Sequence, residues 1–195
     1  MALQGHLASV KVQSSAIAMT DEATTTSDNI SYQITNSAKR IMDLNTTVVV
    51  EDSAVLTTEN YRVDYLNGTI IFDTATSRTI TVTGAYVTPT TAATARSYSI
   101  TTSRDVLENT PFNTGFRTYQ AGLLTGTASL ERFHVTDDLF IDQLLNGEYK
   151  IIEFYVDATD KVSFYGLPSN NNIDSPVEGL IMENLDFQIT NQIEV

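Results

Sequence analysis

Cysteine and tryptophan are absent from this chain of 195 residues, and histidine occurs only twice. The missing cysteines exclude disulfide frameworks, thiol nucleophiles and thiolate-ligated zinc. Positive charge is scarce: 11 Lys and Arg stand against 24 Asp and Glu, which gives a formal net charge of −13. A protein that grips phosphate backbones needs basic stripes, so this balance argues against tight binding to nucleic acid.

Long hydrophobic runs are also missing. No apolar stretch approaches the ~20 residues that a membrane-spanning helix needs. The first six residues, MALQGH, lack the charged and apolar regions of a secretory signal. We therefore expect a protein that is made and kept soluble in a cytosol, and that leaves the cell only by lysis or as part of a particle. Hydrophobic residues make up 42% of the chain, which is enough for a core.

The dominant pattern is the alternation of apolar and polar residues, which is the period of a half-buried strand. The clearest example is 61–73, YRVDYLNGTIIFD, where an Asn-Gly pair separates two such runs and predicts a β-hairpin. A second hairpin is predicted from strands at 149–156 and 161–167. Further strands are expected at 7–12, 15–19, 78–87, 97–101, 122–133 and, as one bent strand or two, 177–190.

One helix is predicted, at about 136–146. Thr136 suits the N-cap, two aspartates suit the positive first turn, and Asn146-Gly147 supplies a C-terminal stop. Polar, Pro- or Gly-containing stretches are expected to be loops, at 20–29, 88–95, 104–118 and 169–172.

The fold class expected from these elements is mainly β, with one short flanking helix. By composition the chain divides into an N-terminal arm with the first strands (1–40), a β-meander with the Asn-Gly hairpin (41–95) and a C-terminal β part with the helix (96–195). We expect these parts to pack as one subunit fold.

Signals for catalysis are weak. His6 and His134 each lack a second histidine at ligand spacing, and a Ser-His-Asp triad would have to use one of these two. The sequence has no G-x-S-x-G elbow, no phosphate-binding loop and no dinucleotide fingerprint. We therefore predict no enzyme, no cofactor and no metal centre.

Two clusters admit a binding role beside a structural one. Asp157 and Asp160 flank a tight turn, and with the asparagines at 170–172 they could form a weak calcium site. Asp and Asn also form ordinary turns, which is the interpretation we favour. Aromatic residues on the second hairpin pose a similar choice between a ligand platform and cross-strand sheet pairs, and we favour the pairs: Phe154, Tyr155, Phe164 and Tyr165.

Several short segments follow one another in a distinctive order. In the N-terminal half they are GHLA (5–8), MTDEA (19–23), YQIT (32–35), AKRIMD (38–43) and the hairpin at 61–72; in the C-terminal half they are 105–110, 115–117, 121–123, the helix and the paired strands. This order resembles that of phage tail tube proteins, the major tail protein family. The similarity covers most of the chain, although each motif is loose.

The resemblance implies a structural virion protein with a β-sandwich or β-barrel of tail-tube type and long inter-subunit loops. Such subunits form hexameric rings that stack into a tube, through which DNA passes during ejection. The implied partners are further copies, tail terminator, baseplate or tail-tip and tape-measure proteins, DNA in non-adhesive transit and, in a contractile tail, a sheath protein. No membrane partner is implied. The implied location is the virion tail, after assembly in the host cytoplasm.

The negative charge is unevenly distributed. Residues 1–95 hold nine acids and five bases, a net of −4, whereas 96–195 hold fifteen and six, a net of −9. A negative lumen repels phosphates and removes the counterion release that drives binding. We hypothesise that acids on or beside the C-terminal strands face the lumen: Glu153, Asp157, Glu183 and Asp186. The sequence is equally compatible with a solvated outer face for these residues.

Three other functions fit the same pattern. The first is the tube of a contractile tail or injection system. The second is a different virion protein, such as a head decoration or tail-completion subunit. The third is a β-sandwich carbohydrate-binding module, against which the absence of tryptophan argues.

Overall fold

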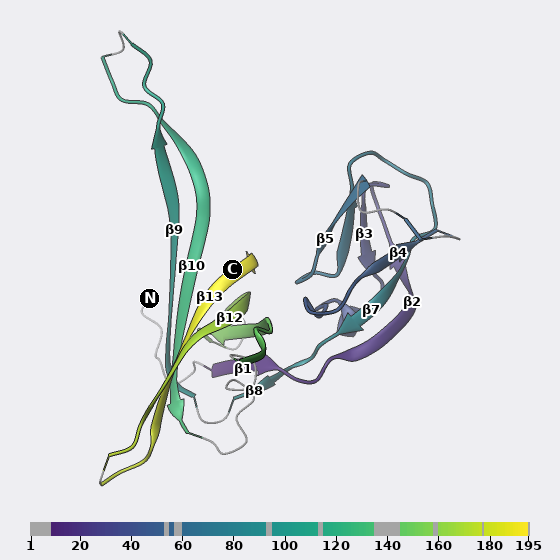
Figure 1. Ribbon diagram of the computed structural model, residues 1–195. Helices are drawn as coiled ribbons and strands as arrows, with labels where there is room; N and C mark the ends of the chain where they lie inside the picture. Colours follow the sequence, from purple (N-terminus) through teal and green to yellow (C-terminus); the bar gives the residue numbers. More distant parts are fainter. Residues whose placement is uncertain are drawn as a thin grey trace. The chain divides into compact units, whose positions relative to one another are not determined.

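The computed structural model of the protein describes residues 9–52, 55–56, 60–92, 95–112, 115–134, 145–157, 160–176 and 178–194. Over these ranges the chain is mainly β with curled sheets, as expected (Figure 1). The elements are β1 Ser9–Gln13, β2 Ile17–Thr25, β3 Ser31–Ile34, the 3-10 turn η2 Ser37–Lys39, β4 Val49–Glu51, β5 Tyr61–Asp64, β6 Thr69–Phe72, β7 Thr81–Tyr86, β8 Pro89–Thr91, β9 Ala95–Glu108, β10 Tyr119–Phe133, β11 Lys150–Tyr155, β12 Lys161–Asp174 and β13 Met182–Glu194.

The strands form a six-stranded sheet in the order β4-β7-β2-β3-β6-β5 and a seven-stranded sheet in the order β8-β1-β11-β12-β13-β10-β9. The chain divides into two compact units. Unit 1 comprises 1–93, 148–165 and 192–195, and unit 2 comprises 94–147 and 166–191. Strand β12 therefore contributes its first residues to unit 1 and the rest to unit 2.

The hairpin predicted at 61–73 is present in unit 1 as β5 and β6, with Asp64 opposite Thr69. The Asp64 carboxylate accepts a hydrogen bond from the Asn67 backbone N–H at 3.0 Å and so stabilises the turn. Gly68 has a φ of 58°, and a Cβ there would lie 2.6 Å from the carbonyl oxygen of Arg40. Both the backbone angle and the close approach require glycine.

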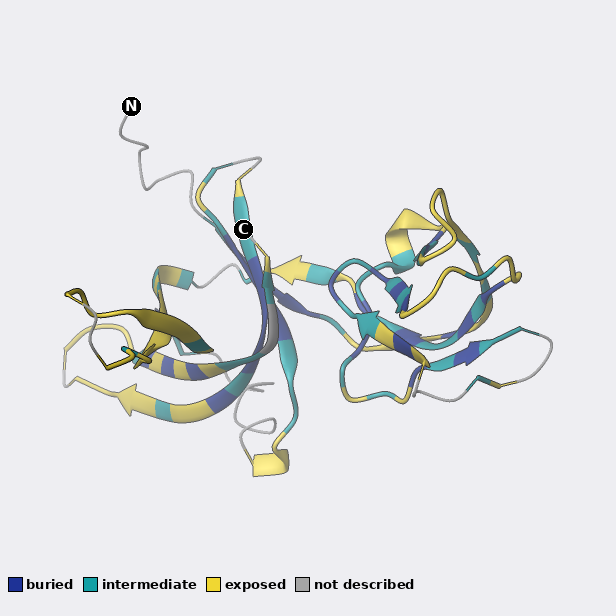
Figure 2. Ribbon diagram, turned by 90° about the horizontal axis from the view of Figure 1, so that it is seen from above, coloured by how far each residue is buried: buried dark blue, intermediate teal, exposed yellow. Residues whose placement is uncertain are grey.

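The six-stranded sheet of unit 1 curls around its own apolar core. Ile34, Met42, Val50, Ile70 and Val82 are completely buried there. Buried apolar side chains alternate with half-buried ones along β3 and β6, and Figure 2 shows such alternation as bands of different burial. Burial of this apolar surface is the main favourable contribution to the stability of the sheet.

The prediction of a loop at 20–29 is wrong for residues 20–25, because β2 continues to Thr25. The register slips between Met19 and Glu22, and Asp21 in this bulge has a φ of 50°. Residues before and just after the bulge pair with β7, whereas Thr24 and Thr25 pair with β3. The bulge breaks the alternation by which sequence reveals a strand.

The linker expected at 88–95 is also partly strand. β8 spans Pro89–Thr91 and pairs with β1, and β9 begins at Ala95. Its side chains are small and polar because β8 is the end strand of its sheet, where one edge and much of the surface face water.

A second core cluster of unit 1 joins the six-stranded sheet to β11 and β12. It contains Leu66, Val87, Ile151 and Tyr165. The Tyr165 hydroxyl donates to the backbone carbonyl oxygen of Met42. The same hydroxyl oxygen lies 3.1 Å from the backbone carbonyl oxygen of Tyr65. Burial raises the pKa of Tyr165, and the charge of Asp43 adds to the shift. Tyr165 thus packs in the core against Tyr65, whereas the cross-strand pairing that we favoured for the hairpin aromatics is present between Phe154 and Phe164, whose ring centroids lie 5.3 Å apart.

Unit 2 is built on long strands where loops were expected. β9 continues to Glu108, so the predicted loop 104–118 is reduced to the residues that follow, and 169–172 lies within β12. These segments lack a clear alternation because most of their residues are exposed on both faces. The helix predicted at 136–146 lies outside the described residues except for Leu145 and Asn146, which are helical. No helix in the described ranges has the length and apolarity to cross a membrane.

Candidate functional site

Glu153, the first candidate lumen acid, is buried in unit 1 with 3% of its surface exposed. Its carboxylate accepts a hydrogen bond from Lys161 and another from the Tyr155 hydroxyl at 2.9 Å. Burial alone would lower the pKa of Lys161, but the hydrogen bond and charge of Glu153 raise it overall. The contact with Lys161 joins β11 to β12, so this carboxylate has a structural role within unit 1.

Glu183, on β13 of unit 2, is completely buried. Its Oε2 accepts from Arg132 Nε at 2.9 Å and Nη2 at 2.8 Å, while Oε1 accepts from Asn171 Nδ2 at 2.7 Å. His134 Nδ1 lies 3.6 Å from Oε2. A carboxylate without solvent exposure needs such partners, because an unpaired buried charge is strongly destabilising.

The other two candidate acids are accessible. Asp186 is exposed on β13 and accepts a hydrogen bond from Asn170 Nδ2 at 3.1 Å. Asp157 is half-buried and accepts from the Asp160 backbone N–H at 2.8 Å, which is an ordinary turn contact. The described residues contain no cluster of three or more His, Asp or Glu side chains able to hold a metal ion.

Strand register explains why Glu183 and Asp186 differ. Successive side chains of a strand point to opposite faces, so residues three apart lie on different faces. Glu183 pairs with Arg132, and Asp186 pairs with Ser129. The face with Glu183 is the core face, where Leu130 and Leu185 are also buried. The face with Asp186 is open.

This open face of β9, β10 and β13 is almost entirely polar. Its side chains are exposed or half-buried, and most carry hydroxyl or carboxamide groups. We call it the polar track, and its members are Ser97, Ser99, Thr101, Ser103, Thr125, Thr127, Ser129, Glu131, Asn184, Asp186 and Gln188. The sequence displays this pattern as hydroxyls at alternate positions of 97–103, a signal that we read only as a strand.

The core face of the same sheet continues outward along the β9–β10 hairpin. Beyond Thr127, where pairing with β13 ends, the hairpin extends as a two-stranded ribbon (Figure 1). Val106 pairs with Ala121 and Arg104 with Leu124, on the side that carries the core residues further down. Val106 is 66% exposed and Leu124 is 51% exposed, so the described residues leave at least half of each side chain uncovered.

The loop at the end of this ribbon adds aromatic side chains that are even more exposed: 104% for Phe112 and 87% for Phe116. An apolar patch of this kind is typical of a protein–protein contact. We call these residues the apolar tip: Val106, Leu107, Phe112, Phe116, Tyr119, Leu123 and Leu124.

Comparison with known proteins finds no matching family model and no matching curated protein. Among solved structures, the chain is similar to a chain from the tail of an empty gene transfer agent particle, refined with helical C6 symmetry. The two share 14% identity with a TM-score of 0.49, over 54% of this chain and 84% of the other. A chain from the virion of a native gene transfer agent particle matches with 12% identity and a TM-score of 0.48, over 54% and 86%.

Proposed function

We propose that this chain is a structural subunit of a phage-type tail tube, in which copies associate into rings and the rings stack. The observation that carries the proposal is the apolar tip. An isolated two-stranded ribbon is marginally stable in water. This one presents Val106 and Leu124 on one face and two exposed phenylalanines at its end. A further copy of the chain would cover these side chains and stabilise the ribbon.

The edge of the sheet in unit 2 supports the same proposal. β9 is the last strand in its sheet, and the described residues provide no strand on its outer side. Its 14 residues carry a long row of backbone donors and acceptors. An open edge of this length favours pairing with another chain, and closure into a ring removes it.

Different contacts would serve the ring and the stack. Both are head-to-tail contacts, in which one surface of a copy binds a different surface of the next copy. Such contacts produce a closed ring when the rotation between copies brings the last copy back to the first, and a growing filament when it does not. Within unit 2 the open edge and the apolar tip are two such surfaces. Under this proposal the ring is a hexamer, and the remaining partners are tail terminator, baseplate or tail-tip and tape-measure proteins, with DNA in transit.

Electron microscopy and sedimentation of the purified chain test the proposal. The wild-type protein should form six-fold rings or hollow filaments at high concentration. Phe112→Ser combined with Phe116→Ser should shift it toward single subunits with an unchanged far-ultraviolet circular dichroism spectrum. Val55→Ser is the matched control, because Val55 is 65% exposed but lies in unit 1.

The outcomes separate the other functions as well. A monodisperse wild-type monomer at high concentration would overturn the tube, and glycan binding by that monomer would favour a carbohydrate-binding module. Trimers without stacking would point to a decoration protein. Tubes that recruit an outer sheath would assign the chain to a contractile system.

A further inference from the structure

We propose that the polar track faces the lumen as a neutral, hydroxyl-rich lining, along which double-stranded DNA moves because positive charge is missing, rather than because carboxylates repel it. This inference rests on the proposed tube. The sequence led us to expect that carboxylates prevent DNA from adhering to the lumen, whereas this inference assigns that role to uncharged hydroxyl groups.

Three of the four candidate acids do not supply repulsion on this face. Glu153 and Glu183 are buried, and both are neutralised by a lysine or arginine within the chain. Asp157 lies in the turn between β11 and β12 and contacts the Asp160 backbone. Of the four, only Asp186 belongs to the polar track, and its Oδ2 accepts a hydrogen bond from the Asn170 carboxamide.

The track itself carries two carboxylates and no positive charge, and one of the carboxylates is paired with a neighbouring arginine. Besides Asp186 it carries Glu131, which accepts a hydrogen bond from Ser97 at 2.8 Å and pairs with Arg96 at 3.6 Å. Arg96 also lies over the Phe133 ring, 5.4 Å from its centroid. This arginine at the lower end of the track is therefore held by its neighbours and offsets one of the two carboxylates.

The hydroxyl groups of the track are largely satisfied by one another. Ser99 and Ser129 are joined across the strands with 2.7 Å between their oxygens, and Ser103 and Thr125 with 2.9 Å. Each pair keeps one O–H that could donate to a phosphate, but that neutral hydrogen bond only replaces one to water and brings little net gain. Neutral hydroxyls also release no counterions, which is the term that dominates affinity for DNA.

The spacing of the track favours movement over binding. Hydroxyl pairs recur at every second residue along β9 and β10, a step of roughly 7 Å. Because the side chains are short and alike, DNA that advances by one step meets the same chemistry again. No position along this stretch stands out as a trap.

Lysine substitution on the track tests the inference on assembled tubes. Thr101→Lys adds one positive charge per copy at an exposed position in the middle of β9. Tubes of this variant, incubated with short double-stranded DNA, should retain DNA that resists nuclease, whereas wild-type tubes retain none. With about six phosphate contacts, retention should fall roughly 10³-fold between about 50 and 200 mM salt. Thr101→Gln is the matched control, because it places a long side chain without charge at the same exposed position, and its tubes should retain no DNA.

Neutralising the acid distinguishes the two explanations. Asp186→Asn removes the one accessible lumen candidate on the track and should leave DNA retention at the wild-type level. If Asp186→Asn tubes trapped DNA as Thr101→Lys tubes do, repulsion by carboxylates would be the mechanism and the neutral lining would be wrong. If Thr101→Lys tubes formed normally but retained no protected DNA, the track would not face the lumen. Wild-type protein that formed no tubes would instead overturn the proposed function.

Discussion

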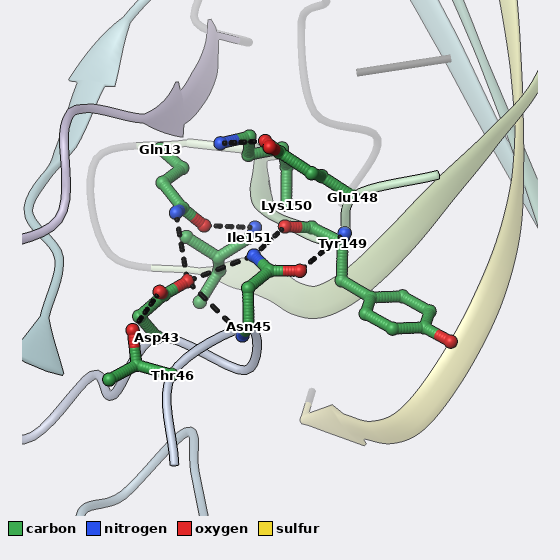
Figure 3. Close-up of polar contacts among 8 residues, drawn as sticks. All are labelled: Gln13, Asp43, Asn45, Thr46, Glu148, Tyr149, Lys150 and Ile151. Carbon is green, nitrogen blue, oxygen red and sulfur yellow. Dashed lines mark hydrogen bonds and ion pairs between the residues drawn. The ribbon is translucent and has the colours of Figure 1, made fainter. Parts of the chain in front are cut away.

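Asn45 and Tyr149 are joined by a reciprocal pair of hydrogen bonds. The Asn45 side chain donates to the Tyr149 carbonyl oxygen at 2.8 Å and accepts from the Tyr149 backbone N–H at 3.0 Å (Figure 3). A carboxamide thus satisfies the backbone of Tyr149, just before β11 begins. Gln13 makes a similar contact two residues further along, where its side-chain Oε1 accepts a hydrogen bond from the Ile151 backbone N–H at 3.0 Å.

Asp43 orients both amides. Its Oδ1 accepts from Gln13 Nε2 at 3.3 Å and from Asn45 Nδ2 at 3.0 Å, and its Oδ2 accepts from Thr46 Oγ1 at 2.6 Å. Asp43 is only 4% exposed, so these donors replace the water that it loses. The network ties three segments distant in sequence into unit 1.

We predict that Asn45→Ala lowers the free energy of unfolding by about 1 kcal/mol, because it removes two accessible hydrogen bonds to the Tyr149 backbone and one to the buried Asp43 carboxylate. Hydrogen exchange should accelerate at the Tyr149 amide, which loses its acceptor, before it accelerates in the core of β11. Chemical denaturation and amide exchange measure the two effects. Asn60→Ala, at an exposed asparagine of unit 1, should change stability by less than about 0.5 kcal/mol. Equal effects of the two variants would contradict the role of the network.

The buried ion pair of unit 2 supports a second prediction. Glu183→Gln leaves the Arg132 guanidinium, 8% exposed, without its carboxylate, and should destabilise the protein by about 3–5 kcal/mol. Replacing both residues, as in Arg132→Met with Glu183→Leu, should recover most of that loss, since the uncompensated charge is then gone. Denaturant titration of the single and double variants measures both values. A double variant no more stable than Glu183→Gln would show that the charge is not the cause.

What the sequence could predict was local. The hairpin at 61–73 follows from Asn67 and Gly68, two of the four residues in its turn, and the alternating strands follow from one buried face. The sequence predicts loops at 104–118 and 169–172, because strands exposed on both faces, such as 104–108, show no alternation. Their strand conformation depends on neighbours that are distant in sequence.

The burial of the acids could not be predicted for a related reason. Glu183 is completely buried because Arg132 stands opposite it, 51 residues earlier in the chain. Composition gives the charge of a segment, but strand register decides which face a carboxylate occupies. Asp186 and Glu183, three residues apart, therefore lie on opposite faces of one strand.

Gly68 allows a prediction about the β5–β6 hairpin. Gly68→Ala should destabilise the protein by more than about 1 kcal/mol, because φ is 58° and the new Cβ would lie 2.6 Å from the Arg40 carbonyl oxygen. Gly115→Ala is the matched control, since its Cβ would meet nothing within 4 Å and its φ is not in the left-handed region. Thermal unfolding of both variants measures the contrast, and a Gly68→Ala protein as stable as the control would contradict the role of the turn.

Tyr165 makes the stability of unit 1 sensitive to alkaline pH. Burial, and then the charges of Asp43 and Asp64, raise its pKa, so the folded protein keeps the phenolic proton at a pH where the unfolded chain loses it. The unfolded state then binds fewer protons than the folded state, and stability falls as pH rises above about 10. The contribution is fully present below that pH.

Tyr165→Phe should therefore be less stable than wild type at pH 8, by about 1–3 kcal/mol, because the carbonyl oxygen of Met42 loses its donor. Its stability should also decline less steeply between pH 9 and 11. A residual slope is expected, since burial also raises the pKa of Tyr61, Tyr65 and Tyr98. Urea denaturation across this pH range measures both terms. Parallel curves for the two proteins would mean that Tyr165 ionises alike in the folded and unfolded states, which its burial opposes.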